Sequence, residues 1–287
     1  MAGLTLGVLY GLIAMLGFGI SDTLLKPVIL RIGEVSAATY RGLFITSCLF
    51  LFALLTGSLV VPTLSTFLLL LLLGLLGMGG YYSFCKGLKV GELSVVSPIS
   101  RVYIVITVLL AVIFFGESLR ALQIAGIALV VLGAVGISFT LSHIKKVWKI
   151  NGTVKSAPYG IITALSWGLI YFLLKIPVDR IGAVSAAFWF EGSILLFFSI
   201  LYFTGSPPTV SSRDYGILIL LAIFSAAGSL ALSAGLAAGL VSVVMPIVAA
   251  VPLVTVTLSF FFLKERLELN QKIAVGVIFA GLVLLSL

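Results

Sequence analysis

Long apolar runs constrain this chain more than any other feature of its sequence. Short polar breaks, such as GESLR at 116–120, separate stretches that are almost wholly apolar. A helix needs about 20 apolar residues to cross a hydrocarbon core of roughly 30 Å. We therefore predict an all-α integral membrane protein with ten transmembrane helices, at residues 5–25, 36–57, 66–88, 93–115, 121–142, 157–176, 185–204, 214–237, 240–263 and 270–287.

The composition supports this assignment and excludes several classes of protein. Hydrophobic residues make up 61% of the chain and charged residues 9%, against about 25% charged in soluble domains. The net charge of +8 is spread over the gaps between apolar runs, which is typical of membrane-flanking loops rather than of a nucleic-acid surface. Cys48, Cys85 and His143 form no metal or disulfide pattern. No glycine-rich loop ends in Gly-Lys-Ser or Gly-Lys-Thr, so we expect neither an ATP site nor another cofactor.

The chain contains an internal repeat. At an offset of 149, residues 10–38 align with residues 159–187, and 15 of the 29 aligned positions are identical. At an offset of 148, GLKVGELSVVSPI (87–99) aligns with GLAAGLVSVVMPI (235–247). The repeat predicts two five-helix units, residues 1–142 and 157–287, joined by a basic linker at 143–156.

The odd number of spans in each unit predicts that the second unit enters the membrane from the opposite side. The two halves are then inverted repeats, an arrangement that recurs in secondary transporters. The phrase RIGEVSAA at 31–38 recurs as RIGAVSAA at 180–187, once for each face of the membrane. We expect both copies to form the turn between the first two spans of their half, with the Gly as a helix C-cap and the Ser as a helix N-cap.

The sequence resembles the drug/metabolite transporter superfamily, and in particular its EamA-type ten-span members. The resemblance extends over nearly the whole chain and rests on SVVSPI (94–99), SVVMPI (242–247), GESLRALQIAG (116–126) and KERLELNQKIA (264–274). The last of these has Lys264 and Ala274 where the first copy has glycine. The resemblance implies a carrier that works by alternating access, with a central cavity between its halves.

Ionisable side chains inside the spans are the first candidates for the transport path. A charge in the bilayer costs at least about 2.5–3.5 kcal/mol, so it normally faces protein or water. The candidates are Asp22, Arg41, Lys86, Arg101 and Glu191. Arg41, Arg101 and Glu191 have no opposite charge three or four residues away, so other helices, water or substrate must compensate them. Lys86 lies near the end of its span, from which its ammonium group can reach the interface.

Prolines and aromatic residues add further candidates. Pro98 and Pro246 match in the repeat, and each either frees a carbonyl toward a cavity or only kinks its helix. GMGG at 77–80 precedes Tyr81 and Tyr82, and Trp167 lies near mid-membrane, away from the interfaces where Trp is enriched. We predict that substrate is bound by Asp22, Arg41, Tyr81, Tyr82, Pro98, Arg101, Trp167, Glu191 and Pro246. We expect Glu117 and Glu265 to stabilise the N-termini of the helices that follow them.

Counting residues along the spans gives the depth of each charge. We define side B as the face reached by the loop between the first two spans, and side A as the opposite face. Asp22, Arg41, Lys86 and Arg101 then lie in the half of the membrane toward side B, as a basic vestibule open to that side. Glu191 lies toward side A, too far from Arg41 for an ion pair.

The orientation in the membrane has two answers. Twelve Lys and Arg residues flank the spans on side B and three do so on side A. The positive-inside rule therefore places side B in the cytoplasm and both termini outside. The resemblance to ten-span family members implies the reverse orientation.

The leading functional hypothesis is a secondary carrier in the cell membrane. It would export or exchange a small metabolite, such as an amino acid or another organic anion, with Glu191 or Asp22 able to couple a proton. It would have no metal site and no nucleic-acid partner, and it would act as a monomer or homodimer. The alternatives are a lipid scramblase, a membrane-embedded enzyme or a regulatory subunit. A membrane enzyme calls for paired carboxylates or histidines at one depth, which the sequence does not place there.

Overall fold

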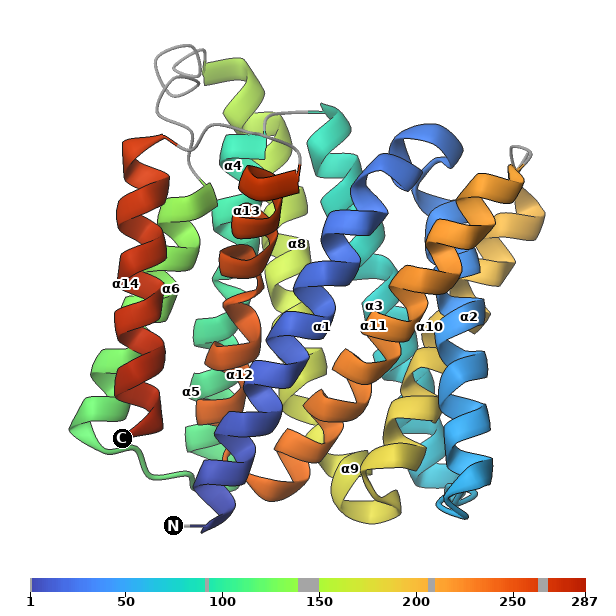
Figure 1. Cartoon of the computed structure of the whole chain (residues 1–287), viewed down its shortest axis with the longest axis horizontal. Helices are drawn as coiled ribbons and strands as arrows, with labels where there is room; N and C mark the ends of the chain where they lie inside the picture. Colours follow the sequence, from blue (N-terminus) through green and yellow to red (C-terminus); the bar gives the residue numbers. More distant parts are fainter. Residues whose placement is uncertain (1, 91–92, 139–149, 206–209, 263–267) are drawn as a thin grey trace.

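The computed structural model describes residues 2–90, 93–138, 150–205, 210–262 and 268–287, and every element in those ranges is a helix (Figure 1). The elements, in chain order, are α1 (Ala2–Ile32), α2 (Glu34–Leu55), α3 (Leu64–Val90), α4 (Leu93–Arg101), α5 (Tyr103–Phe115), α6 (Ala121–Ser138), α8 (Ile150–Leu173), α9 (Lys175–Ile181), α10 (Ala183–Thr204), α11 (Ser212–Ala238), α12 (Val241–Ala249), α13 (Val251–Phe262) and α14 (Leu269–Ser286).

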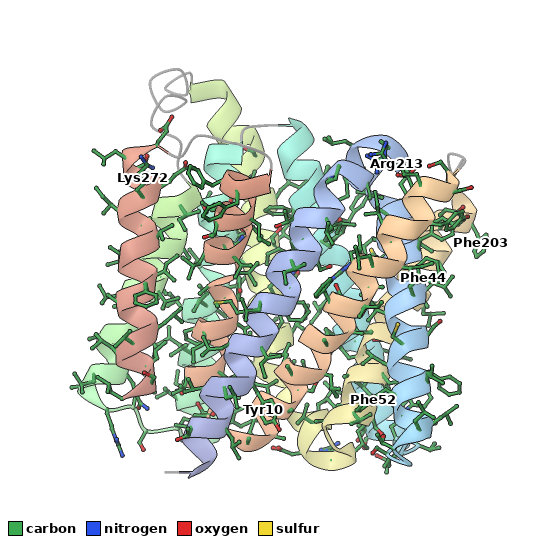
Figure 2. All side chains as sticks on the ribbon, viewed as in Figure 1. Tyr10, Phe44, Phe52, Phe203, Arg213 and Lys272 are labelled. Carbon is green, nitrogen blue, oxygen red and sulfur yellow. The ribbon has the colours of Figure 1, made fainter. Side chains whose placement is uncertain are left out.

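Nine helical segments in the described ranges are long and apolar enough to cross a membrane. The expected tenth span, at 93–115, is divided into α4 and α5, and its apolar part, Ile99–Phe115, is shorter than the others. Large apolar side chains cover the outer surface, among them Leu55 at 78% exposure and Phe203 at 81% (Figure 2). Such a surface is suited to lipid, because exposed apolar patches of this extent are rare on soluble monomers.

The fourth span of each half is broken at matching positions. The breaks lie at Val102, between α4 and α5, and at Ala250, between α12 and α13. Each comes four residues after the matched proline, Pro98 or Pro246, and at each the backbone N–H bonds three residues back, to Ile99 at 3.1 Å or to Ile247 at 3.1 Å. A proline ring clashes with the preceding turn and removes one N–H donor, so it favours a break nearby.

The helix packing is reciprocal between the two halves. α1 packs on α11 as α3 packs on α8, and α5 packs on α8 as α13 packs on α1. α2 packs on α10 and α6 on α14, so these two contacts join equivalent helices. The two chain ends lie together at the lower face in Figure 1, which is side A, whereas Arg213 and Lys272 lie at the upper face, side B (Figure 2).

Glycine sets the closest of these contacts. A Cβ added to Gly17 of α1 would lie 2.7 Å from the Phe224 carbonyl oxygen and 3.0 Å from Gly228 Cα, both in α11. A Cβ on Gly281 of α14 would lie 2.8 Å from the Gly126 carbonyl oxygen of α6. Small residues at such crossings let membrane helices approach closely enough to pack without a hydrophobic driving force.

The repeated phrase does form the turn between the first two spans of each half. Gly33 and Gly182 have φ of 78°, a region that glycine adopts without strain. The expectation that the serine is the helix N-cap was wrong, because Gly33 and Gly182 themselves are the N-caps and no side chain caps α2 or α10. Ser185 instead accepts the Val60 N–H at 2.8 Å and donates to the Ser58 carbonyl at 2.6 Å.

Candidate functional site

A cavity of about 630 Å³ lies among α1, α2, α3, α8, α10 and α11 and both broken spans. This volume is in the range of small-molecule sites, roughly 300–1,000 Å³. Leu30 and Glu34, at the α1–α2 turn, line one end of the cavity, so it extends to side B. Ile170 of α8 and Phe190 of α10 line the cavity beyond mid-span, toward side A.

Five charged side chains line this one cavity. Glu34 lies at its side-B end, and deeper in the cavity are Asp22 from α1, Arg41 from α2, Arg101 from α4 and Glu191 from α10. The Arg41 charge acts on both Asp22 and Glu191, and the Arg101 charge acts on Asp22. Among the described residues no ion pair joins Glu191 to Arg41, in keeping with the expected separation, although both line the same cavity. Beyond Glu34 at its side-B end, the cavity is lined by two cations and two carboxylates, rather than by basic residues alone.

Serines of α11 hold two of these charges in place. Arg41 donates from Nε and Nη2 to Ser225 Oγ, at 3.3 and 3.1 Å, and Ser225 shares a 2.5 Å hydrogen bond with Ser21 of α1. One turn further along α11, Ser229 hydrogen-bonds the Glu191 carboxylate. Small hydroxyl residues suit these places because α1 and α11 approach closely.

Arg101 differs from Arg41 in having an unused donor. It ends α4, directly before the helix break, and its charge acts on Asp22 and on Tyr103. Its Nε is buried without a hydrogen-bond partner in the structure. A buried donor without a partner costs about 1–3 kcal/mol, so an acceptor on a bound molecule would be stabilised there.

Aromatic rings form the cavity wall beside Arg101. Tyr103 packs edge-on against Trp167, with 5.7 Å between ring centroids, and lies 5.4 Å from Tyr171. Phe84 lies 5.7 Å from Trp167 on its other side. Tyr81 also lines the cavity, with its ring edge-on to Phe198 at 5.6 Å and its hydroxyl buried near Cys85. The site therefore combines a cation with a broad apolar surface.

Six of the nine predicted substrate-binding residues line the cavity: Asp22, Arg41, Tyr81, Arg101, Trp167 and Glu191. Tyr82 is 39% exposed and packs under Lys86, whose Nζ lies 5.9 Å from the ring centroid, away from the cavity lining. Pro246 is buried within α12 and does not line the cavity. The side chain of Pro98 lies outside the described part of the structure.

The repeat identifies cavity residues that single-residue reasoning missed. At the offset of 149, Asp22 matches Tyr171, Arg41 matches Phe190, Glu191 matches Gly42 and Trp167 matches Phe18. Both members of each pair line the cavity. The two halves thus supply equivalent positions, but every charged lining residue except Glu191 comes from the first half. The two sides of the cavity therefore differ in charge.

The expected role of Glu117 requires a correction. The helix that follows it, α6, begins at Ala121, and there the Gln123 side chain accepts the Arg120 N–H at 3.0 Å. The Glu117 carboxylate instead accepts the N–H groups of Val241 and Ser242, both at 2.8 Å, at the start of α12 in the other half. Glu265 lies outside the described residues. In the described ranges, no group of three or more His, Cys, Asp or Glu residues is placed to hold a metal.

Comparison with known proteins gives a consistent result. The model of the EamA-like transporter family matches residues 5–139 and again residues 155–287. A protein of Archaeoglobus fulgidus described as an uncharacterized transporter is 28% identical over 265 residues, 88% of this chain and 89% of that protein. An uncharacterized protein of Methanocaldococcus jannaschii is 31% identical over 131 residues, 45% of this chain and 93% of that protein. A solved crystal structure has the same fold, with a TM-score of 0.76 over 99% of this chain and 96% of that one, at 13% identity.

Proposed function

The chain belongs to the EamA-like transporter family, and we propose that it is a secondary transporter for a small charged metabolite in the cell membrane. It exports or exchanges its substrate, such as an amino acid or another organic anion, without ATP. The observation that carries this proposal is the cavity of about 630 Å³ that brings Asp22, Arg41, Arg101 and Glu191 together between the halves. Membrane-embedded charges of this kind are functional by default, because burying them has a high cost.

Alternating access follows from ten spans arranged as two inverted five-helix repeats. The reciprocal helix contacts and the matching breaks at Val102 and Ala250 support this arrangement. The family model also matches the chain twice, and the relative from Methanocaldococcus jannaschii corresponds to about half of it. Rocking of one half against the other would close side B and open side A around a fixed central site.

Arg101 anchors the anionic group of the substrate, and the wall of Tyr103, Trp167 and Phe84 accommodates its apolar part. Because a guanidinium presents a planar pair of donors, a carboxylate can bind it in a bidentate manner. Arg41 has a different role, since Ser225, Asp22 and Glu191 already surround it. Its charge partly offsets the cost of burying the two carboxylates.

The balance of charges determines how protons are coupled. Beyond Glu34 at the side-B end, the interior of the cavity holds two cations and two carboxylates, so a net-neutral dipolar substrate enters it without adding charge. A net anion leaves one negative charge in excess, which is costly away from water. Protonation of Glu191 or Asp22 would remove that excess. Proton coupling is therefore expected for anionic substrates and not for dipolar ones.

Binding tests the proposal directly. Purified protein would be screened against classes of metabolites by thermal shift, and each hit repeated with Arg101→Gln, Arg101→Lys and Lys86→Gln. We expect stabilisation of the parent protein and of Lys86→Gln, an exposed cation outside the cavity. The shift is expected to fall in both Arg101 variants, because Lys cannot reproduce the planar fork. An undiminished shift in a folded Arg101→Gln protein would remove Arg101 from the site, and stabilisation by lipids alone would favour a scramblase.

A further inference from the structure

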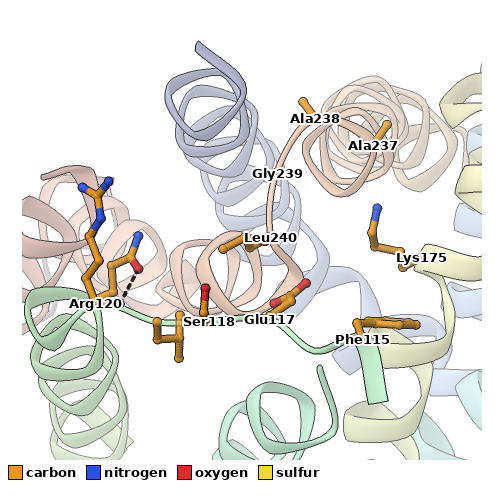
Figure 3. A pocket seen from close by; sticks show the side chains of 11 residues that line it. Phe115, Glu117, Ser118, Arg120, Lys175, Ala237, Ala238, Gly239 and Leu240 are labelled. Atoms are coloured by element: carbon orange, nitrogen blue, oxygen red, sulfur yellow. Dashed lines mark hydrogen bonds between the residues drawn. The ribbon is translucent and has the colours of Figure 1, made fainter. Parts of the chain in front are cut away.

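Two cavities on opposite faces of the protein are separated by α12. The central cavity reaches Val248 and Val251, around the C-terminal end of this nine-residue helix. A second cavity of about 670 Å³ opens on side A, and the α11–α12 connection lines it at Gly239 and Leu240, directly before the helix starts (Figure 3). Displacement of α12 would therefore join the central cavity to side A.

The first turn of α12 is held by one residue of the other half. Leu240, the N-cap residue, makes no side-chain cap, so the first N–H groups depend on another acceptor. Glu117 provides both carboxylate oxygens: Oε1 to the Val241 N–H and Oε2 to the Ser242 N–H, each at 2.8 Å. The Ser242 hydroxyl also donates to Oε2. A carboxylate at a helix N-terminus gains further from the helix dipole.

Further contacts close side A around this point. Lys175 donates to the Leu236 carbonyl at 2.9 Å, at the end of α11. Arg180 donates to Thr66 at 3.2 Å, linking α9 to the start of α3. Figure 3 shows Glu117 between the Leu240 connection and the Phe115 end of α5. Glu117 is only 8% exposed, so compensation of its charge depends on the donors of Val241 and Ser242.

We propose that Glu117 is the latch of a side-A gate: its carboxylate holds α12 in the closed position, and its release allows α12 to move and the cavity to open to side A. This inference rests on the proposed function, because only a protein that alternates between faces needs such a gate. The break at Ala250 supplies the hinge about which α12 turns.

Accessibility of a cavity cysteine tests the latch without any substrate. Ile194 lines the central cavity at mid-span of α10. Ile194→Cys would be placed in a chain that also carries Cys48→Ser and Cys85→Ser. An impermeant maleimide would then be added to right-side-out and inside-out membrane vesicles. We expect the parent reporter to react mainly from side B, where the cavity opens.

Glu117→Gln should increase the labelling rate from side A by about tenfold or more, since a hydrogen bond to a charged group is worth roughly one to two powers of ten in an equilibrium. Labelling from side B should fall. Ser242→Ala removes only one donor, and it should increase labelling from side A about threefold. Ser118→Ala is the matched control, because Ser118 lines the same side-A cavity next to Glu117. It should label as the parent does.

The proposal would be overturned if a folded Glu117→Gln protein were labelled from side A and from side B at the same rates as the parent reporter. If Glu117→Gln does not fold, Ser242→Ala decides. Labelling of Ser242→Ala at the rates of the parent reporter would likewise overturn the proposal. Increased labelling from side A without flux of any metabolite would support the gate and contradict the transport proposal. Flux with unchanged labelling would contradict the gate alone.

Discussion

Replacing Gly17 by alanine should separate α1 from α11 and disturb the central cavity that both helices line. The added Cβ would lie 2.7 Å from the Phe224 carbonyl oxygen, whereas ordinary contact begins at 3.4 Å. The two backbones must therefore move apart by roughly half an ångström at this point. Ser21 of α1, one turn along from Gly17, shares a 2.5 Å hydrogen bond with Ser225 of α11, so a separation of this size stretches that bond to the long end of the usual range.

The expected cost follows from overpacking. Forcing one extra methyl group into a well-packed contact costs about 1–3 kcal/mol, and the weakening of the Ser21–Ser225 hydrogen bond adds to it. Gly276 of α14 is the matched control, because a Cβ there meets nothing within 4 Å. Gly276→Ala should be neutral or should stabilise by about 0.5–1 kcal/mol through its helix propensity.

The difference in stability between the two purified variants would be measured in detergent, by thermal shift and by denaturant titration. We expect Gly17→Ala to unfold at a lower temperature and a lower denaturant concentration than the parent, and Gly276→Ala to unfold at or above it. Equal stability of the two variants would refute the reasoning, since it would mean that the α1–α11 contact relaxes without cost.

Three further predictions follow from the contacts between the halves. Arg31→Gln should lower the unfolding temperature more than Arg180→Gln. Arg31 forms an ion pair with the Asp214 carboxylate at 2.6 Å, whereas Arg180 donates to the uncharged Thr66 hydroxyl at 3.2 Å. The reverse order of unfolding temperatures in thermal shift would contradict this. Ser225→Ala should weaken substrate binding more than it lowers stability, because Arg41 loses its support, and Ser47→Ala, an exposed serine on α2, should leave binding unchanged. Single cysteines at Ser58 and Lys272 should label from opposite faces of the membrane, and a cysteine at Lys149 then decides which face is cytoplasmic; labelling of Ser58 and Lys272 from one face would contradict the inverted repeat.

The sequence predicts most of the architecture because its information is local. The apolar runs and the repeat locate the helices, and a charge within an apolar run is sufficient to indicate Asp22, Arg41, Arg101 and Glu191. Residue counting locates Cα atoms and neglects the reach of long side chains such as Arg41, which extends from α2 to Ser225 on α11, so counting did not show that Glu191 and the basic residues line one cavity.

Contacts between the halves could not be predicted in the same way. Glu117 stabilises a helix 124 residues further along the chain, at Val241, and no spacing rule connects the two. Pro246 does not itself line the cavity, and the break near each matched proline lies four residues later, where Arg101 and Tyr103 line the cavity beside the break in the first half. The repeat was the one signal that reached across the chain, because it pairs Tyr171 and Phe190 with charged residues of the first half.

Exchange flux tests the central claim most directly. Proteoliposomes containing the purified protein would be loaded with a labelled metabolite identified by thermal shift, and its exit measured with and without the unlabelled metabolite outside. An alternating-access carrier predicts saturable exit that is accelerated by outside substrate and reduced in Arg101→Gln but not in Lys86→Gln. Exit that does not saturate, is indifferent to outside substrate and is equal in both variants would contradict transport through this cavity.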